Sequence, residues 1–143
     1  MKKRIMAIAI AVCMLFSLNI TADARGVLSS EYIDNIIVGI SPLGNSGMKV
    51  YVIVTANTVM SKVGISSLEI EEAKSINGPW SVKKTWSCSG STYYDNNVDT
   101  YIGSFSFTGT PGYYYRAHTT GYAFSSASSG DETFASSYAQ KCT

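Results

Sequence analysis

Apolar and polar residues alternate in short runs along most of this 143-residue chain. Residues 48–56 show the pattern most clearly, because Met48, Val50, Val52 and Val54 occupy every second position. A period of two places these side chains on one face of a β-strand and the intervening ones on the other. Segments rich in Gly, Pro, Asn and Ser separate the runs, as turns do. The pattern predicts seven strands, at 32–40, 48–56, 64–73, 79–87, 100–107, 109–124 and 131–140.

Seven short strands joined by turns predict an all-β domain, a single antiparallel β-sandwich in which two sheets cover each other's apolar faces. A loop is expected at 57–63, between the second and third strands. The helix formers in SLEIEEAKS are the main local argument against the third strand, but they extend for only about two turns. Leu68 and Ile70 are expected to share one face of their strand, and Trp80, Val82 and Trp86 one face of the next. Tyr101, Phe105 and Phe107 are expected to face inward.

Residues 1–24 have the pattern of a secretory signal peptide. A basic start precedes an apolar segment at 5–20, and Ala22 and Ala24 supply the small residues that signal peptidase requires. Cleavage is expected after Ala24, which leaves residues 25–143 as one secreted, extracellular domain. An uncleaved membrane anchor is the alternative, but polar residues end the apolar segment short of the ~20 residues that a spanning helix needs.

Cleavage would remove Cys13 and leave Cys88 and Cys142. An even pair of cysteines in an exported chain predicts one disulfide bond, with two free thiols as the alternative. The expected strand order creates a difficulty, because it places the strand that ends near Cys88 and the last strand at opposite ends of the domain. A bond would require the segment 88–98 to turn back along the edge, or a different topology.

The segment PGYYYRAHTTGYA, residues 111–123, resembles the F strand of fibronectin type III and related immunoglobulin-like domains, in which a Pro-Gly turn precedes a tyrosine corner. The longer stretch from ISSLEIEEAKS to GYYYRA also resembles small secreted proteins of Firmicutes. The resemblance implies an immunoglobulin- or fibronectin III-like sandwich with Tyr113 as the corner residue. It also implies that 64–72 is the neighbouring strand.

That register sends alternate side chains of the strand to opposite faces. The inward set is Tyr113, Tyr115, Ala117 and Thr119. The outward set is Tyr114, Arg116, His118 and Thr120. The first three of these, with Glu69 and Glu71 of the neighbouring strand, form what we call the outward strip. Two interpretations of the outward strip stay open. It is either a solvated sheet face with weak ion pairs, or a flat polar and aromatic surface that stacks on a sugar ring or a partner protein.

Catalysis is not expected from this sequence. His118 is the only histidine, and nucleophilic catalysis needs a serine or cysteine and an orienting carboxylate around it. No G-x-S-x-G motif is present. The adjacent carboxylates at 71–72 and 131–132 are expected to point to opposite faces of their strands. No cofactor is expected either.

Asp95, Asn97 and Asp99 are a weak candidate for a calcium site, since oxygen ligands at alternate positions are typical of Ca²⁺ loops. Thr100 and Ser106 stand where an EF-hand loop needs Gly and Glu. A polar turn is the simpler interpretation, and no metal is expected.

The charges are nearly balanced, with 11 Lys and Arg against 10 Asp and Glu. No basic cluster predicts nucleic-acid binding, and no second apolar segment of ~20 residues predicts a membrane span after cleavage. These features predict a secreted, non-catalytic extracellular module that binds a cell-envelope glycan or protein. A secreted antagonist, such as a bacteriocin-like or inhibitor protein, is the alternative, and a hydrolase that depends on His118 is a third hypothesis.

Overall fold

The computed structural model describes residues 30–143, so the expected signal peptide at 1–24 and Cys13 lie outside the described residues. This part of the chain forms seven antiparallel strands and no α-helix, which confirms the predicted all-β class. None of the described residues belongs to a helix long and apolar enough to cross a bilayer. The strands are β1 (Ile33–Gly44), β2 (Gly47–Ala73), β3 (Ser81–Ser87), β4 (Tyr94–Thr108), β5 (Tyr114–Ser126), β6 (Ser129–Ser136) and β7 (Gln140–Lys141), and a short 3-10 turn, η1 (Ser91–Tyr93), precedes β4.

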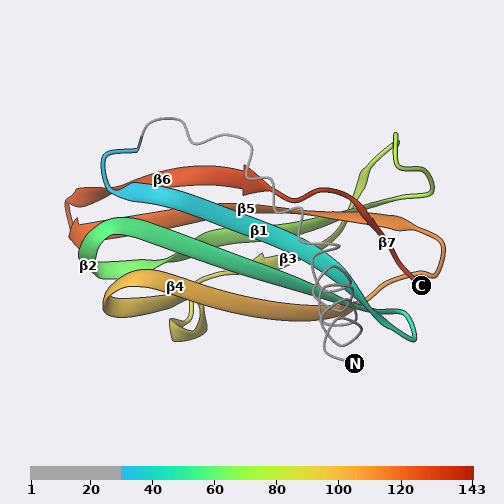
Figure 1. The fold of residues 1–143 in the computed structure, drawn as a ribbon, viewed down its shortest axis with the longest axis horizontal. Coiled ribbons are helices and arrows are strands. Elements are labelled where there is room, and N and C mark those ends of the chain that lie inside the picture. The colour runs from blue at the N-terminus through green and yellow to red at the C-terminus, as the bar shows by residue number, and fades with distance from the viewer. Residues whose placement is uncertain (1–29) are drawn as a thin grey trace, which may run out of the picture.

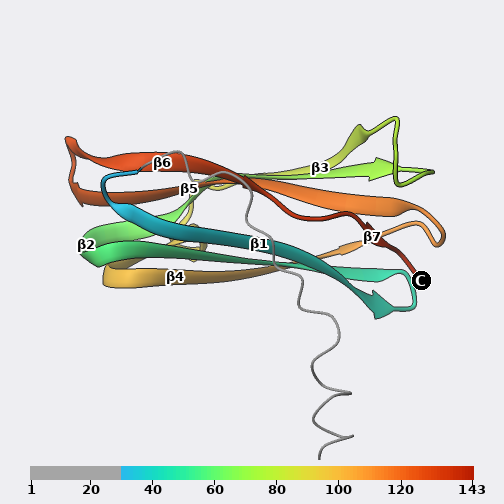
Figure 2. The same cartoon turned by 45° about the horizontal axis from the view of Figure 1, so that its top comes forward.

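The strand β2 is the centre of the fold, because it pairs with β1, β3, β4 and β5. Residues 47–56 of β2 pair with β1, and residues 62–73 pair with β5. The strand therefore passes from one layer of the domain to the other (Figure 1). A view turned by 45° shows β1 and β4 in one layer and β3, β5 and β6 in the layer above it (Figure 2).

The predicted strands at 48–56 and 64–73 are one continuous strand of 27 residues. The loop predicted at 57–63 is present only as a shift in the register with β4, between Thr55 and Met60. Thr and Val in this segment favour extended backbone, and no Gly or Pro interrupts it. The hydrogen-bonded ladder is therefore a single seven-stranded sheet that bends over itself through β2.

The core lies between the two layers and contains most of the side chains that alternation predicted to face inward. Met48, Val50, Val52 and Val54 are fully buried. Leu68, Ile70, Tyr101, Phe105 and Phe107 are buried as well, as predicted. Burying one such side chain stabilises the fold by roughly 1.5–3 kcal/mol. A shift of β2 by one residue would turn its whole apolar set to the solvent, so this register is strongly specified.

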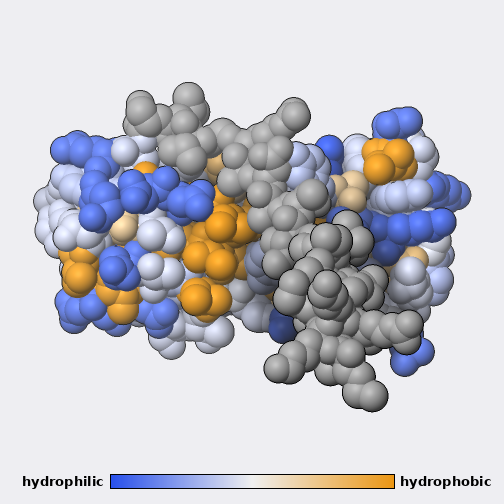
Figure 3. All heavy atoms as spheres, viewed as in Figure 1, coloured by the Kyte–Doolittle hydropathy of each residue, from blue (hydrophilic) through white to orange (hydrophobic). Residues whose placement is uncertain are grey.

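Apolar side chains also reach the surface on the face seen in Figure 1, where they gather between more polar ends (Figure 3). Among the described residues, Ile102 of β4 is the most exposed large apolar side chain, at 69%.

Trp80, Val82 and Trp86 do not share a face, contrary to the prediction. Trp86 packs against aromatic rings of the core, whereas Val82 is exposed and Trp80 lies on the outer face. The register between β2 and β3 shifts between Ile70 and Glu71. The extra residue in β3 forms a bulge. Side chains before the bulge therefore point to the opposite face from the one that alternation predicts from the residues after it.

Cys88 and Cys142 are free thiols in the structure, which does not contain the predicted disulfide. Cys88 follows the residue of β3 that pairs with Ser67 of β2. Cys142 follows β7, whose partner on β5 is level with Ala73 of β2. Ser67 and Ala73 are six residues apart on β2, or about 20 Å at ~3.3 Å per residue. The Cα atoms of bonded cysteines must lie within about 7 Å of each other. The strand order thus separates the two residues, which is the difficulty noted from the sequence.

The β1–β2 hairpin holds the C-terminal end of the chain. It turns at Asn45 and Ser46, whose φ angles of 51° and 65° are typical of a type I′ turn. The N–H of Ser46 donates to the carbonyl of Thr143 at 3.2 Å. The strand predicted at 131–140 is divided between β6 and the two-residue β7. After β7 the last residues reach this hairpin.

Asp131 of β6 holds the start of the described chain. Its Oδ2 accepts hydrogen bonds from the hydroxyl of Ser30 at 2.9 Å and from the N–H groups of Glu31 and Tyr32 at 2.6 and 2.9 Å. The bond from Ser30, followed by the one from the Tyr32 N–H, lowers the pKa of Asp131 below its ordinary value. The carboxylate therefore joins β6 to the residues that enter β1.

Candidate binding site

The strand β5 sends alternate side chains to the core and to the outer face, as predicted. Tyr115, Ala117 and Thr119 are buried, whereas Arg116 and His118 are partly exposed. The outward strip therefore occupies the outer face of β5.

Tyr115, rather than Tyr113, bonds back to the backbone upstream of β5. Its hydroxyl accepts a hydrogen bond from the N–H of Thr110 at 2.7 Å and donates one to Oε2 of Glu72 at 3.0 Å. Burial raises the pKa of Tyr115, so the hydroxyl keeps its proton. Tyr113 lies in the turn before β5 and packs on the core without this bond. The resemblance implied such a bond for Tyr113, whereas in the structure Tyr115 makes it, and both side chains pack on the core.

The neighbour of β5 is the second half of β2, as predicted. Glu69 pairs with His118, and Glu71 pairs with Arg116. Residues directly opposite each other in a ladder share a face, so these four side chains lie together on the outer surface.

Glu71 connects two members of the outward strip. Its Oε2 accepts hydrogen bonds from Nε of Arg116 at 2.5 Å and from Nε2 of His118 at 2.8 Å. Burial alone would raise the pKa of Glu71, but the bonds from Arg116 and His118 outweigh it and hold this pKa below 4.5. The carboxylate is therefore charged at neutral pH. The exposed fractions of the side chains, 18% for Glu71, 19% for His118 and 34% for Arg116, leave all three accessible.

His118 also contacts Ser136 of β6, whose Oγ lies 2.6 Å from Nδ1. Because the Glu71 carboxylate only accepts hydrogen bonds, Nε2 carries a proton, and Ser136 donates to Nδ1 when the ring is neutral. The order Ser136, His118, Glu71 is that of the hydrogen bonds in a serine–histidine–acid triad. The sequence analysis missed Ser136, since only the register of β5 with β6 places it opposite His118.

Two aromatic side chains lie at the ends of this arrangement. The ring of Phe134 stacks on the ring of His118, with centroids 5.7 Å apart and planes inclined by 14°, and Phe134 is 56% exposed. The guanidinium carbon of Arg116 lies 4.4 Å from the centre of the Trp80 ring, a cation–π contact. We call Trp80, Arg116, Glu71, His118 and Phe134 the Glu71 cluster. The sequence analysis missed both aromatic members, because the face of each depends on a bulge or a register that alternation does not reveal.

The other two residues of the outward strip, Tyr114 and Glu69, are not bonded to any member of the Glu71 cluster in the described structure. Nζ of Lys141 lies 5.8 Å from the centre of the Tyr114 ring, close to β7. Glu69 makes no ion pair or side-chain hydrogen bond within residues 30–143. The structure therefore joins three of the five predicted residues and adds Trp80, Phe134 and Ser136.

The weak calcium candidate lies in β4 rather than in a loop. Asp95, Asn97 and Asp99 are all exposed, and Asn97 has a left-handed backbone with a φ of 57°. Across the described part of the chain, no three His, Cys, Asp or Glu side chains are grouped so that they could hold a metal ion. Asn tolerates this left-handed backbone better than most residues, which accounts for its place in β4 without a metal ion.

Comparison of the chain with protein-family models, with curated proteins and with solved structures finds no match.

Proposed function

We propose that this protein is a secreted, non-catalytic extracellular module that binds a cell-envelope glycan through the Glu71 cluster. The observation that carries the proposal is the exposed ring of Phe134, which stacks on a histidine that is itself bonded to a charged carboxylate. Side chains that hold one another in this way lose little conformational freedom when a ligand arrives. A surface that is ordered before binding supports recognition.

The chemistry of the Glu71 cluster suits a neutral sugar. Within the described residues, Oε1 of Glu71 and the terminal nitrogens of Arg116 make no hydrogen bond, so an acceptor and several donors lie side by side. Sugar hydroxyls both donate and accept, and the apolar faces of sugar rings pack on aromatic rings such as Phe134 and Trp80. Glu71 and Arg116 neutralise each other, so the surface does not select strongly for a charged ligand.

We also propose that the domain is an immunoglobulin- or fibronectin III-like β-sandwich. The order of pairing supports this proposal. The first part of β2 lies between β1 and β4, and the second part lies between β3 and β5, with β6 beyond β5. Immunoglobulin-like domains group their A, B and E strands in one sheet and their C, F and G strands in the other. The chain follows this order if β2 supplies both the B and the C strand.

Binding of the purified protein to an array of bacterial and host glycans tests the function. We expect a retained glycan that is lost on Phe134→Ser and on Arg116→Ala. Ile102→Ser is the matched control, because it also removes an exposed apolar side chain but lies on β4, away from the Glu71 cluster. Thermal unfolding verifies that each variant is folded.

Two outcomes would contradict the proposal. Glycan binding that survives in both cluster variants would place the site elsewhere. Capture of a purified envelope protein or protease, with no glycan retained, would favour a protein target and hence the antagonist hypothesis.

A further inference from the structure

A second feature of the outer face is a pocket at the far end of β5. Its volume is about 360 Å³, and its lining residues are Ser61, Lys62, Asn96, Phe124, Ser126 and Ala127. Small-molecule pockets are typically ~300–1,000 Å³ in volume. Phe124 is six residues along β5 from His118, or about 20 Å at ~3.3 Å per residue. The pocket is therefore separate from the Glu71 cluster.

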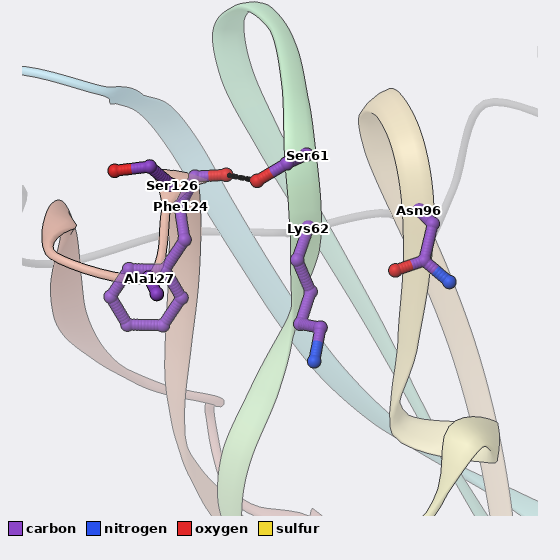
Figure 4. A pocket seen from close by; sticks show the side chains of 6 residues that line it. All are labelled: Ser61, Lys62, Asn96, Phe124, Ser126 and Ala127. Carbon is purple, nitrogen blue, oxygen red and sulfur yellow. Dashed lines mark hydrogen bonds between the residues drawn. The ribbon is translucent and has the colours of Figure 1, made fainter.

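Strand pairing places the main side chains of the pocket in one row. Lys62 of β2 pairs with Asn96 of β4 on one side and with Phe124 of β5 on the other. Directly opposite residues share a face, so the three side chains stand next to one another. Figure 4 shows the Lys62 side chain between those of Phe124 and Asn96. Two residues further along β2, Gly64 lies between Tyr94 and Tyr122 in the same way.

The wall of the pocket is aromatic and held in place. The Phe124 ring lies directly over the backbone of Gly130 in β6. A Cβ atom at Gly130 would lie 1.9 Å from Cδ1 of Phe124, so only glycine leaves room for the ring there. The ring also packs against Tyr122 at 5.1 Å between centroids. Ser61 donates a hydrogen bond to the carbonyl of Phe124 at 2.7 Å. These contacts give the pocket a fixed apolar side.

The ammonium group of Lys62 is the only cation among the lining residues. Its Nζ lies 4.0 Å from the centre of the Tyr94 ring, and it forms no ion pair with any residue of the described chain. Glu132 is opposite Tyr122 on β6, so β5 lies between this carboxylate and Lys62. The pocket therefore combines an apolar wall with a positive charge that no carboxylate of residues 30–143 pairs with.

We propose that this pocket binds a small organic carboxylate with an apolar body. The carboxylate pairs with the Lys62 ammonium, and the body packs on the Phe124 ring. The amide of Asn96 supplies a further donor beside the carboxylate. A charge-assisted hydrogen bond and an apolar wall together select for anions of this class over neutral molecules and over inorganic anions.

Titration of the purified protein with benzoate, followed by amide chemical shifts, tests the proposal. We expect saturable shifts confined to residues near 61–62, 96 and 124–127, with a dissociation constant on the order of 1 mM or lower. Benzyl alcohol, which has the ring without the charge, and sulfate, which has charge without the ring, should each bind at least about tenfold more weakly.

Three substitutions at or beside the pocket assign the binding to it, and Phe134→Ser in the Glu71 cluster is the control. Lys62→Gln should weaken benzoate binding about tenfold, and Lys62→Arg, which keeps the charge, should retain most of it. Gly130→Ala should weaken binding by displacing the Phe124 ring, and Phe134→Ser should have no effect. Absence of saturable shifts, equal affinity for benzoate and benzyl alcohol, or unchanged affinity in a folded Lys62→Gln protein would overturn the proposal.

Discussion

Nε2 of His118 lies 2.8 Å from Oε2 of Glu71, across the ladder between β5 and β2. The ladder itself pairs His118 with Glu69 and Arg116 with Glu71. The histidine thus reaches diagonally to the carboxylate that Arg116 already holds, and diagonal neighbours on one face lie within reach of long side chains. This choice of partner concentrates the polar groups of the outer face around one charged carboxylate.

Glu71→Gln should remove part of the acid dependence of stability. Because the folded-state pKa of Glu71 lies below 4.5, the charged form stabilises the fold above pH 4.5, and this stabilisation is lost as the pH falls through the lowered pKa. The cluster is partly exposed, so we expect about 1 kcal/mol or less at neutral pH. Urea unfolding between about pH 3 and pH 7 measures the difference. Glu69→Gln, on the same face without an ion pair, is the control, and identical pH profiles for wild type and Glu71→Gln would contradict the prediction.

Asp131→Ala should release the start of β1 from β6. The variant removes the acceptor for the N–H groups of Glu31 and Tyr32, so these amides should exchange with solvent faster than in the wild type. Since hydrogen bonds lower the pKa of Asp131, the two amides of the wild type should lose their protection from exchange only as the pH falls below 3.8. Hydrogen exchange measured by mass spectrometry or NMR provides the readout. Glu132→Ala should leave both amides protected, and equal protection in the Asp131 variant would rule out this role.

Gly64→Ala should destabilise the protein through a backbone clash. A Cβ atom at this position would lie 2.2 Å from the carbonyl oxygen of Tyr93 and 2.5 Å from Cβ of Tyr94. Overpacking of this kind typically costs 1–3 kcal/mol, so the free energy of unfolding should fall by about 1 kcal/mol or more, and the midpoint of chemical unfolding should fall with it. Gly90→Ala meets nothing within 4 Å and should change the midpoint little. Equal midpoints for the two variants would show that β4 can move away from β2 at this point.

Alkylation should modify both Cys88 and Cys142 in unfolded protein that has not been reduced. In the folded protein Cys88 should react slowly at neutral pH, because burial raises its pKa to about 11 and the thiolate is the reactive form. Intact mass before and after alkylation counts the modified thiols. Alkylation that appears only after a reductant is added would demonstrate the disulfide.

Ester hydrolysis should not exceed the uncatalysed rate, although Ser136, His118 and Glu71 are hydrogen-bonded in series. Arg116 binds the same oxygen of Glu71 as His118 does, which weakens the stabilisation that the carboxylate gives to a protonated histidine. Incubation with p-nitrophenyl acetate measures any turnover. Activity that disappears in both Ser136→Ala and His118→Ala would refute the non-catalytic proposal and favour the hydrolase hypothesis.

Part of the site follows from the sequence because it depends on alternation within a single strand. Once Tyr115 faces the core, Arg116 and His118 face outward, and the neighbouring glutamates follow from the strand order that the resemblance implied. Trp80 does not follow, because a bulge in β3 reverses its face. Phe134 and Ser136 do not follow either, because their positions depend on the register of β5 with β6.

Alternating side chains in the sequence determined the all-β class, most strand positions and most of the core, since a period of two is a local property of each strand. Tertiary structure alone decided that β2 continues through the predicted loop, that Cys88 and Cys142 are free thiols, and that Lys62 lines a pocket beside Phe124. These features depend on bulges and on pairing between distant strands. A bulge adds a single residue that leaves little trace in the sequence, yet it reverses the faces of the residues on either side of it.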